Sequence, residues 1–202
     1  MSINTYATLK TSIIAWSKRA DILSLVDDFI DLAESDMWTK LRIRDMETVT
    51  TGSIAARTLA LPSGFLQMRK LRLISGNKSF ELEFATPESL KVDSTNGLPS
   101  AFTVNTQIEF NRTPDSTYTY EITYYKSLTP LSDAAPTNAV LTRFPTIYLF
   151  GALMFEGAWE LNAEKEAKNQ SLYLAAIERA NSVDQKGRYG PAPRMRVEGS
   201  TP

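Results

Sequence analysis

Carboxylates are the side chains of this chain that could carry chemistry, because its 202 residues include no histidine and no cysteine. Their absence excludes Ser-His-Asp and Cys-His nucleophiles, ordinary zinc sites and a histidine pH switch. Asp27 and Asp31 share a helix face and could form an acid pair or a metal site, but a solvent-exposed acidic face explains them more simply. We therefore predict no catalytic residues, no cofactor and no metal site. The whole acidic group is Asp27, Asp28, Asp31, Glu34 and Asp36.

Two other patterns could bind nucleotides or nucleic acid. Residues 187–190 read Gly-Arg-Tyr-Gly, but they lack the preceding strand, the lysine and the following helix of a phosphate loop. Aromatic residues from Tyr118 to Tyr125 could stack on bases, although the inner face of a β-sandwich explains their alternation better. A Ser-Lys or paired-carboxylate hydrolase stays open on residue type alone, since no spacing selects one pair.

The segment 186–202 is the best candidate for a binding element. Six of its seventeen residues are glycine or proline, and it has too few apolar side chains to form a core. We expect an extended C-terminal arm that becomes ordered on a neighbouring subunit, a partner protein or DNA; an untethered tail is the alternative. The candidate residues of this partner-binding arm are Lys186, Arg188, Tyr189, Arg194 and Arg196.

The composition is that of an ordinary soluble globular protein. Hydrophobic residues make up 43% of the chain and charged residues 22%, and a formal net charge of −1 gives no general attraction to nucleic acid or anionic lipid. The uncharged run between Arg143 and Glu156 is too short to span a bilayer, and residues 1–4 include no basic leader. We expect no membrane association and no export by a signal peptide.

Apolar spacing predicts two helices before residue 45 and two after residue 138. Thr5 should cap the first helix, which runs to about Lys18 and buries Trp16; the second spans about 23–43. Thr142 should cap the third helix, with Pro145 in its first turn and Phe150 in its core. The fourth continues to about residue 184 with an alanine-rich inner stripe, made of Leu172, Ala175, Ala176, Arg179 and Val183.

Between the helices the apolar period changes to the alternation of strands. Two strands should bracket a turn at Gly52-Ser53, and a hairpin should turn at Gly76-Asn77, while a short helix follows Thr86. The sequence therefore predicts an α+β fold: a helical bundle of two N-terminal and two C-terminal helices (1–45 and 139–185), an inserted antiparallel β-domain (46–138) and a flexible C-terminal tail, the extended arm (186–202).

The order and spacing of several motifs resemble those of the head-to-tail adaptor (connector) proteins of tailed bacteriophages. The resemblance covers about residues 5–188 and leaves out the arm. The motifs are Val26–Glu34, Leu41–Glu47, Leu61–Arg69, Ala85–Glu88, Ile122–Lys126, Leu141–Pro145 and Tyr148–Leu153.

The resemblance implies a structural virion protein with a helical bundle and an inserted β-domain. Such adaptors form a homo-oligomeric ring, typically of about twelve copies, beneath the portal. The implied partners are the portal protein, other copies of the chain, downstream tail proteins and the packaged DNA that passes through the channel until genome ejection. The implied location is the head-tail interface of the virion, after synthesis in the host cytoplasm. The alternatives are a phage tail-associated cell-wall-degrading enzyme and a nucleic-acid-binding module.

Overall fold

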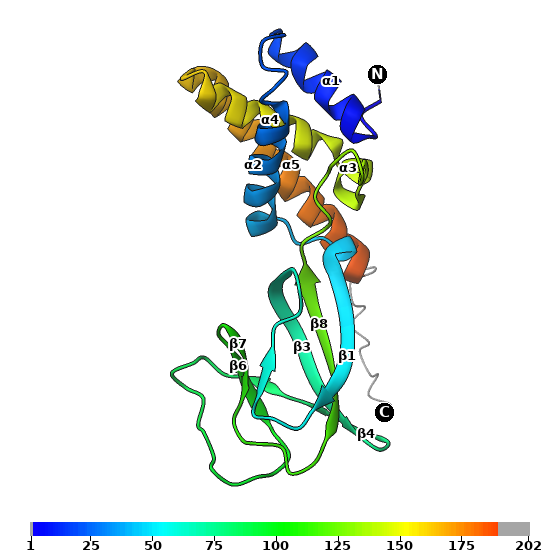
Figure 1. Cartoon of the computed structure of the whole chain (residues 1–202), viewed down its shortest axis with the longest axis vertical. Helices are drawn as coiled ribbons and strands as arrows, with labels where there is room; N and C mark the ends of the chain where they lie inside the picture. The colour runs from blue at the N-terminus through cyan, green and yellow to red at the C-terminus, as the bar shows by residue number, and fades with distance from the viewer. Residues whose placement is uncertain (1, 190–202) are drawn as a thin grey trace, which may run out of the picture. The chain divides into compact units, whose positions relative to one another are not determined.

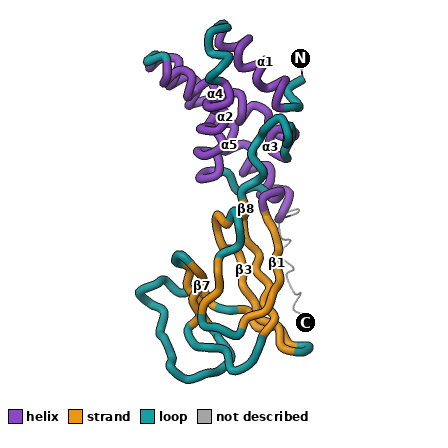
Figure 2. The backbone as a smooth tube through the Cα atoms, in the orientation of Figure 1, coloured by secondary structure: helices purple, strands orange, loops and turns teal. Residues whose placement is uncertain are grey.

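The computed structural model describes residues 2–189. The described residues form two compact units: a helical unit of residues 2–44 and 130–189, and a β unit of residues 45–129. Figure 2 shows the segregation of helices and strands between them. The α+β class predicted from the sequence is thus confirmed, as is the order helices, strands, helices. No helix in the described part of the chain is both long enough and apolar enough to cross a membrane.

Helix α4 is the centre of the helical unit. It packs against the four other helices, as Figure 1 shows. Its side chains Ile147, Tyr148 and Ala152 are fully buried. The helices are α1 (Tyr6–Ser17), α2 (Val26–Lys40), α3 (Ala139–Arg143), α4 (Pro145–Trp159) and α5 (Ala163–Tyr189), and a single 3-10 turn, η1 (Arg44–Met46), follows α2.

The helix starts agree with the sequence in part. Thr5 caps α1 in a capping box with Thr8, as predicted. Helix α4 begins at Pro145, but Thr142 does not cap it, because Thr142 lies inside α3, which Asn138 caps by accepting a hydrogen bond from the Leu141 amide at 2.9 Å. The prediction missed α3 because it did not use Asn138 as a cap and began the helix at Thr142.

The predicted inner face of α1 holds for Tyr6, Leu9 and Ile13 but is wrong for Trp16, and the predicted inner face of α5 is wrong. Trp16 is 59% exposed, and Leu172 and Val183 of the predicted α5 stripe are 40% and 48% exposed. The buried face of α5 is one position away, and it includes two polar side chains that make hydrogen bonds there: Asn169 donates to the Leu153 carbonyl and Asp184 accepts from the Arg44 amide. A search for apolar periodicity therefore could not find it. Its residues are Asn169, Tyr173, Ile177, Ala180 and Asp184.

Helix α5 also extends further than the sequence predicts. It continues through Tyr189, so the expected arm boundary at Lys186 lies inside the helix. One cause is the anchoring of its last turns: Asp184 is buried and accepts a hydrogen bond from the Arg44 amide at 2.7 Å. Residues 190–202, and with them most of the predicted arm, lie outside the described part.

The β unit contains two four-stranded sheets. The first has the order β1-β8-β3-β4 and the second the order β2-β7-β6-β5. Every pair is antiparallel except β5–β6, which is parallel, so the prediction of an antiparallel insert needs this one correction. The strands are β1 (Glu47–Ile54), β2 (Thr58–Ala60), β3 (Phe65–Ser75), β4 (Lys78–Glu81), β5 (Glu83–Phe84), β6 (Ala101–Val104), β7 (Gln107–Phe110) and β8 (Tyr118–Lys126).

Two local predictions in the β unit are wrong. Gly52 lies in the middle of β1, paired with Tyr120 of β8, and does not form a turn. A Cβ atom at Gly52 would lie 2.5 Å from the Tyr120 hydroxyl oxygen, so the glycine makes room for that ring. The segment after Thr86 forms a turn and no helix. The hairpin at Gly76-Asn77 is confirmed.

The aromatic residues of β8 belong to the core of the β unit. Tyr118 and Tyr124 are buried with Ile122 in one apolar cluster. Because bases can stack only on an accessible ring face, these tyrosines do not provide a nucleic-acid surface.

Candidate interaction surfaces

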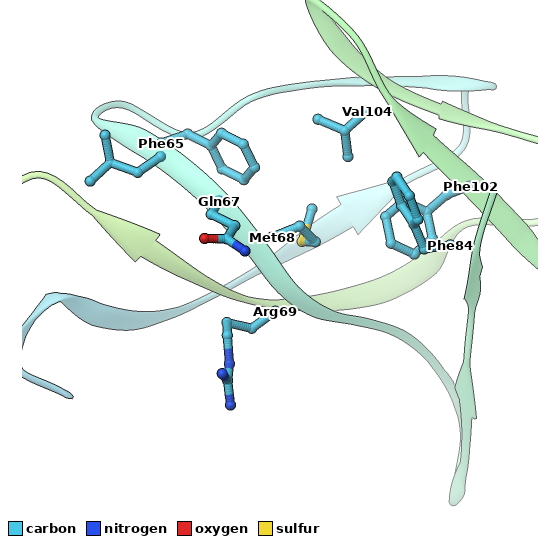
Figure 3. A pocket seen from close by; sticks show the side chains of 8 residues that line it. Phe65, Gln67, Met68, Arg69, Phe84, Phe102 and Val104 are labelled. Atoms are coloured by element: carbon cyan, nitrogen blue, oxygen red, sulfur yellow. The ribbon is translucent and has the colours of Figure 1, made fainter. Parts of the chain in front are cut away.

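An apolar groove of about 520 Å³ lies in the β unit between strand β3 and strands β5 and β6. Figure 3 shows Met68 facing the Phe84 and Phe102 rings across it, while Arg69 points away. Phe84 is 57% exposed, and its ring meets the buried Phe102 ring edge-on at 5.7 Å between centroids. The groove therefore offers an accessible aromatic wall. Its apolar side chains are Phe65, Leu66, Met68, Phe84, Phe102 and Val104.

Two strand edges border this groove. Strand β3 pairs with β8 along its length but with β4 only from Arg72 onward. Strand β5 is the last strand of the second sheet. Among the described residues, neither β5 on its outer side nor β3 from Phe65 to Lys70 has a strand partner there. Uncovered strand edges beside an apolar surface can accept an extended segment by strand addition.

The helical unit exposes large apolar side chains on several helices. One group forms a small groove where Trp16 of α1, Phe150 of α4 and Leu172 of α5 meet. The Trp16 and Phe150 rings are in edge-to-face contact at 5.8 Å, and Phe150, predicted to lie in the core, is only partly buried beside this groove. Exposed apolar groups of this kind are typical of surfaces that bind other proteins. The set is Trp16, Leu23, Leu32, Trp159, Leu161, Leu172, Leu174 and Val183.

Glu34, which the sequence placed on an exposed acidic face, is buried inside the helical unit. One carboxylate oxygen accepts hydrogen bonds from the Leu131 amide at 2.9 Å and from the Tyr148 hydroxyl at 2.7 Å. Burial raises the pKa of Glu34, and the two hydrogen bonds oppose that rise. Burial and the nearby Glu34 charge also raise the pKa of Tyr148. The sequence held a signal, since Glu34 follows Ile30 by four residues on the apolar stripe.

A second charged group joins α1, α4 and α5. The Lys165 ammonium donates hydrogen bonds to Glu156 at 2.6 Å and to Glu160 at 2.8 Å, and Arg19 also pairs with Glu160. Burial raises the pKa of the fully buried Glu156, whereas Lys165 and Arg19 lower that of Glu160. Each acid has a basic partner, so the group acts as a structural tie between helices.

Two of the acidic residues on α2, Asp27 and Asp36, have partners in the helical unit. Asp27 accepts a hydrogen bond from the Tyr6 hydroxyl at 2.8 Å and pairs with Lys10 at 3.3 Å. Asp36 pairs with Lys40 one turn later. Within residues 2–189, no cluster of three or more acidic side chains could hold a metal ion. The geometry therefore assigns these carboxylates to helix packing.

The structure describes only part of the predicted arm. Lys186 is exposed near the end of α5, and Arg188 and Tyr189 continue the helix backbone. Arg194 and Arg196 lie outside the described residues, so the structure does not bring these five residues together or separate them.

A comparison with protein-family models now adds to this geometry. The model of the SU10 adaptor protein family matches residues 4–197. The chain belongs to the SU10 adaptor protein family. This membership confirms the resemblance to phage head-to-tail adaptors, and it indicates a structural role in the virion. A search of curated proteins found no match.

The family match is longer than the resemblance seen in the motifs. It continues to Val197 and thus includes most of the predicted arm, which the motifs left out. The arm up to that residue is therefore part of the adaptor sequence and not an unrelated extension.

Proposed function

We propose that this adaptor forms a ring beneath the portal, typically of about twelve copies, which joins the packaged head to the tail and extends the DNA channel. The observation that carries the proposal is the family match over residues 4–197. The exposed apolar side chains of the helical unit and the groove of the β unit support it, because an adaptor must present contact surfaces to several neighbours. In this proposal the portal protein, tail proteins and further copies of the chain are the partners.

The direct test mixes the purified protein with portal protein and images the particles by electron microscopy. We expect a closed ring added to one end of each portal. Leu172→Asp should reduce the number of portals that carry a ring, because it replaces an exposed apolar side chain of the groove between α1, α4 and α5 with a carboxylate. Ala175→Asp adds the same charge to an exposed position of the same helix and serves as the control.

Bare portals after mixing with the wild-type protein would contradict the proposal. Salt-dependent DNA binding by the free protein, together with bare portals, would support the nucleic-acid-binding alternative. Clearing of cell-wall material in a zymogram would support the enzyme.

A further inference from the structure

We infer that residues 193–198 of one copy add a strand to the groove of the β unit of the next copy. The inference rests on the proposed ring and names the contact that would fasten neighbouring subunits. Two independent features support this contact. One is an apolar groove bordered by strand edges that have no described strand on that side, and the other is a segment whose apolar and charged residues alternate as in a strand.

The groove has the properties that strand addition requires. Its floor is apolar, and Phe84 exposes more than half of its surface. Its borders are the Phe65–Lys70 part of β3 and the short edge strand β5, neither of which has a described strand on that side. An extended segment bound there would gain main-chain hydrogen bonds from an edge and would place alternate side chains against the floor.

The segment from Pro193 to Glu198 fits this groove in its pattern of apolar side chains. It reads Pro-Arg-Met-Arg-Val-Glu, so a strand would present Pro193, Met195 and Val197 on one face and charged side chains on the other. A proline is tolerated at the first position of an added strand. The two arginines would face away from the apolar floor, and the exposed Glu83 of β5 stands at the border. Arg69 and Lys70 stand on the β3 border, so the border carries charges of both signs, and the apolar alternation of the segment is what matches the groove.

A second copy is the occupant that this arrangement favours. The segment and the groove are different surfaces, so each copy can give its segment to one neighbour and receive the segment of the other. Contacts of this head-to-tail kind close into rings when the rotation between copies allows it. The family match supports a role within the adaptor, because it includes Pro193, Met195 and Val197.

The first experiment measures the groove without any ring. The receptor is the full-length chain with Met195→Asp and Val197→Asp, which disable its own segment, and the probe is a fluorescent peptide of residues 189–200. We expect saturable binding, which Phe84→Asp weakens by about tenfold or more because it places a carboxylate in the apolar floor. Val49→Asp is the control, since Val49 is 56% exposed in the same unit and lies outside the groove. A Phe84→Asp receptor that binds as tightly as the control overturns the inference, provided that both melt at the same temperature.

The second experiment decides which copy supplies the segment. The chain has no cysteine, so introduced thiols form only the intended disulfides. Chains carrying Phe84→Cys are mixed with chains carrying Met195→Cys, assembled on portals and oxidised. Disulfide-linked dimers are the expected product, and the double variant should give a ladder of longer chains, whereas Val49→Cys with Met195→Cys should give neither. Links within single chains of the double variant would overturn the assignment to a second copy. If portals stay bare, the proposed function fails, but the peptide measurement still decides the groove assignment.

Discussion

Glu34 shows at the scale of one residue how a buried carboxylate can hold the helices of an adaptor together. Its two hydrogen bonds join α2 to the Leu131 amide and to the Tyr148 hydroxyl of α4. Asn138, the cap of α3, donates in turn to the same hydroxyl at 2.6 Å. Glu34 therefore links the start of α3 to α2 and α4, two helices that lie far apart in the sequence. Removing one member would leave buried polar groups without partners, which costs about 1–3 kcal/mol for each group.

The raised pKa of Glu34 gives a prediction for the pH dependence of stability. Burial raises this pKa in the folded protein above the value of about 4.3 for an unfolded chain, so the folded state binds the proton more tightly. The stabilisation is fully present below the unfolded pKa and is lost as pH rises through the folded pKa. Glu34→Gln cannot ionise, so we expect its stability to rise relative to the wild type as pH increases from about 4.

Thermal unfolding of both proteins across this pH range measures the difference. Glu156, whose pKa is also raised, is present in both proteins and cancels in the comparison. Asp28→Asn, at an exposed position of the same helix, is the matched control. Parallel curves for the wild type and Glu34→Gln would show that Glu34 does not contribute to the pH dependence.

At the scale of elements, the sequence predicts helix and strand boundaries best where a capping or turn residue and the apolar periodicity indicate the same boundary. The Thr5 cap, the start of α4 at Pro145 and the Gly76-Asn77 hairpin follow from local rules, and all three are confirmed. The inner face of α5 does not follow from apolar periodicity, because Asn169 and Asp184 lie on it. The Asn169 amide reaches the Leu153 carbonyl at 3.1 Å, so its burial depends on tertiary contacts that no local pattern contains.

The groove of the β unit was missed for the same reason. Phe80, Leu82 and Phe84 alternate as one strand would, but Phe80 pairs in the first sheet and Phe84 in the second. Only this change of sheet leaves Phe84 at an edge with its ring exposed. Gly52 is a similar case. A side chain at this position would collide with the Tyr120 ring, and Tyr120 lies far from Gly52 in the sequence.

The close packing of α4 on α5 gives a prediction for this pair of helices. A Cβ atom on Gly157 would lie 2.9 Å from the backbone nitrogen of Glu166, so Gly157→Ala should force the two helices apart and destabilise by about 1–3 kcal/mol. Gly187 is exposed in α5, and a Cβ atom there would meet only the Arg44 guanidinium, at 3.8 Å. Gly187→Ala should therefore stabilise slightly, by up to about 1 kcal/mol, as alanine does in a helix.

Denaturant unfolding of the two variants tests whether Gly157→Ala lowers the free energy of unfolding while Gly187→Ala raises it. The substitution is the same in both, so intrinsic helix propensity favours alanine in each. A stabilising Gly157→Ala would mean that α4 and α5 are not packed closely at this point.

At the scale of the whole molecule, the order of the sequence motifs indicates the function better than any single residue does. Among the described residues, the best candidate contact surfaces are apolar and exposed. The family could be found from the sequence because its motifs follow one another in a fixed order along both units. The contact surfaces could not, since they depend on which edges and faces the fold leaves uncovered.

The proposed ring leads to a prediction about assembly. We expect the isolated protein to be monomeric or weakly associated, because the chain has no long heptad seam to hold a permanent oligomer. Portal protein should then trigger the ring by presenting many binding sites at fixed spacing, which raises the effective concentration of neighbouring copies. Sedimentation velocity with and without portal measures both states. A tight dodecamer without portal would contradict the trigger and leave the ring itself in place.

The last prediction concerns residues 190–202. Among the described side chains, the last buried one is that of Asp184, so deleting this segment should leave the melting temperature nearly unchanged. The same deletion should weaken ring formation on portals, because each subunit loses the strand that fastens it to the next. Ordering the segment costs about 1 kcal/mol or more of backbone entropy per residue, and the apolar side chains Met195 and Val197 must offset much of that cost.

Titrating portal with the truncated and the full-length chain, and counting rings by electron microscopy, measures the loss. Arg194→Ser with Arg196→Ser keeps the apolar face of the segment, whereas Met195→Asp with Val197→Asp keeps the arginines, so the two variants separate charge from apolar contact. We expect the second variant to resemble the truncation and the first to lose less, because only the second disrupts the face that would pack on the groove. Wild-type ring formation by the truncated chain would show that the segment fastens nothing, and a truncated chain that no longer folds would show that its role lies within the monomer.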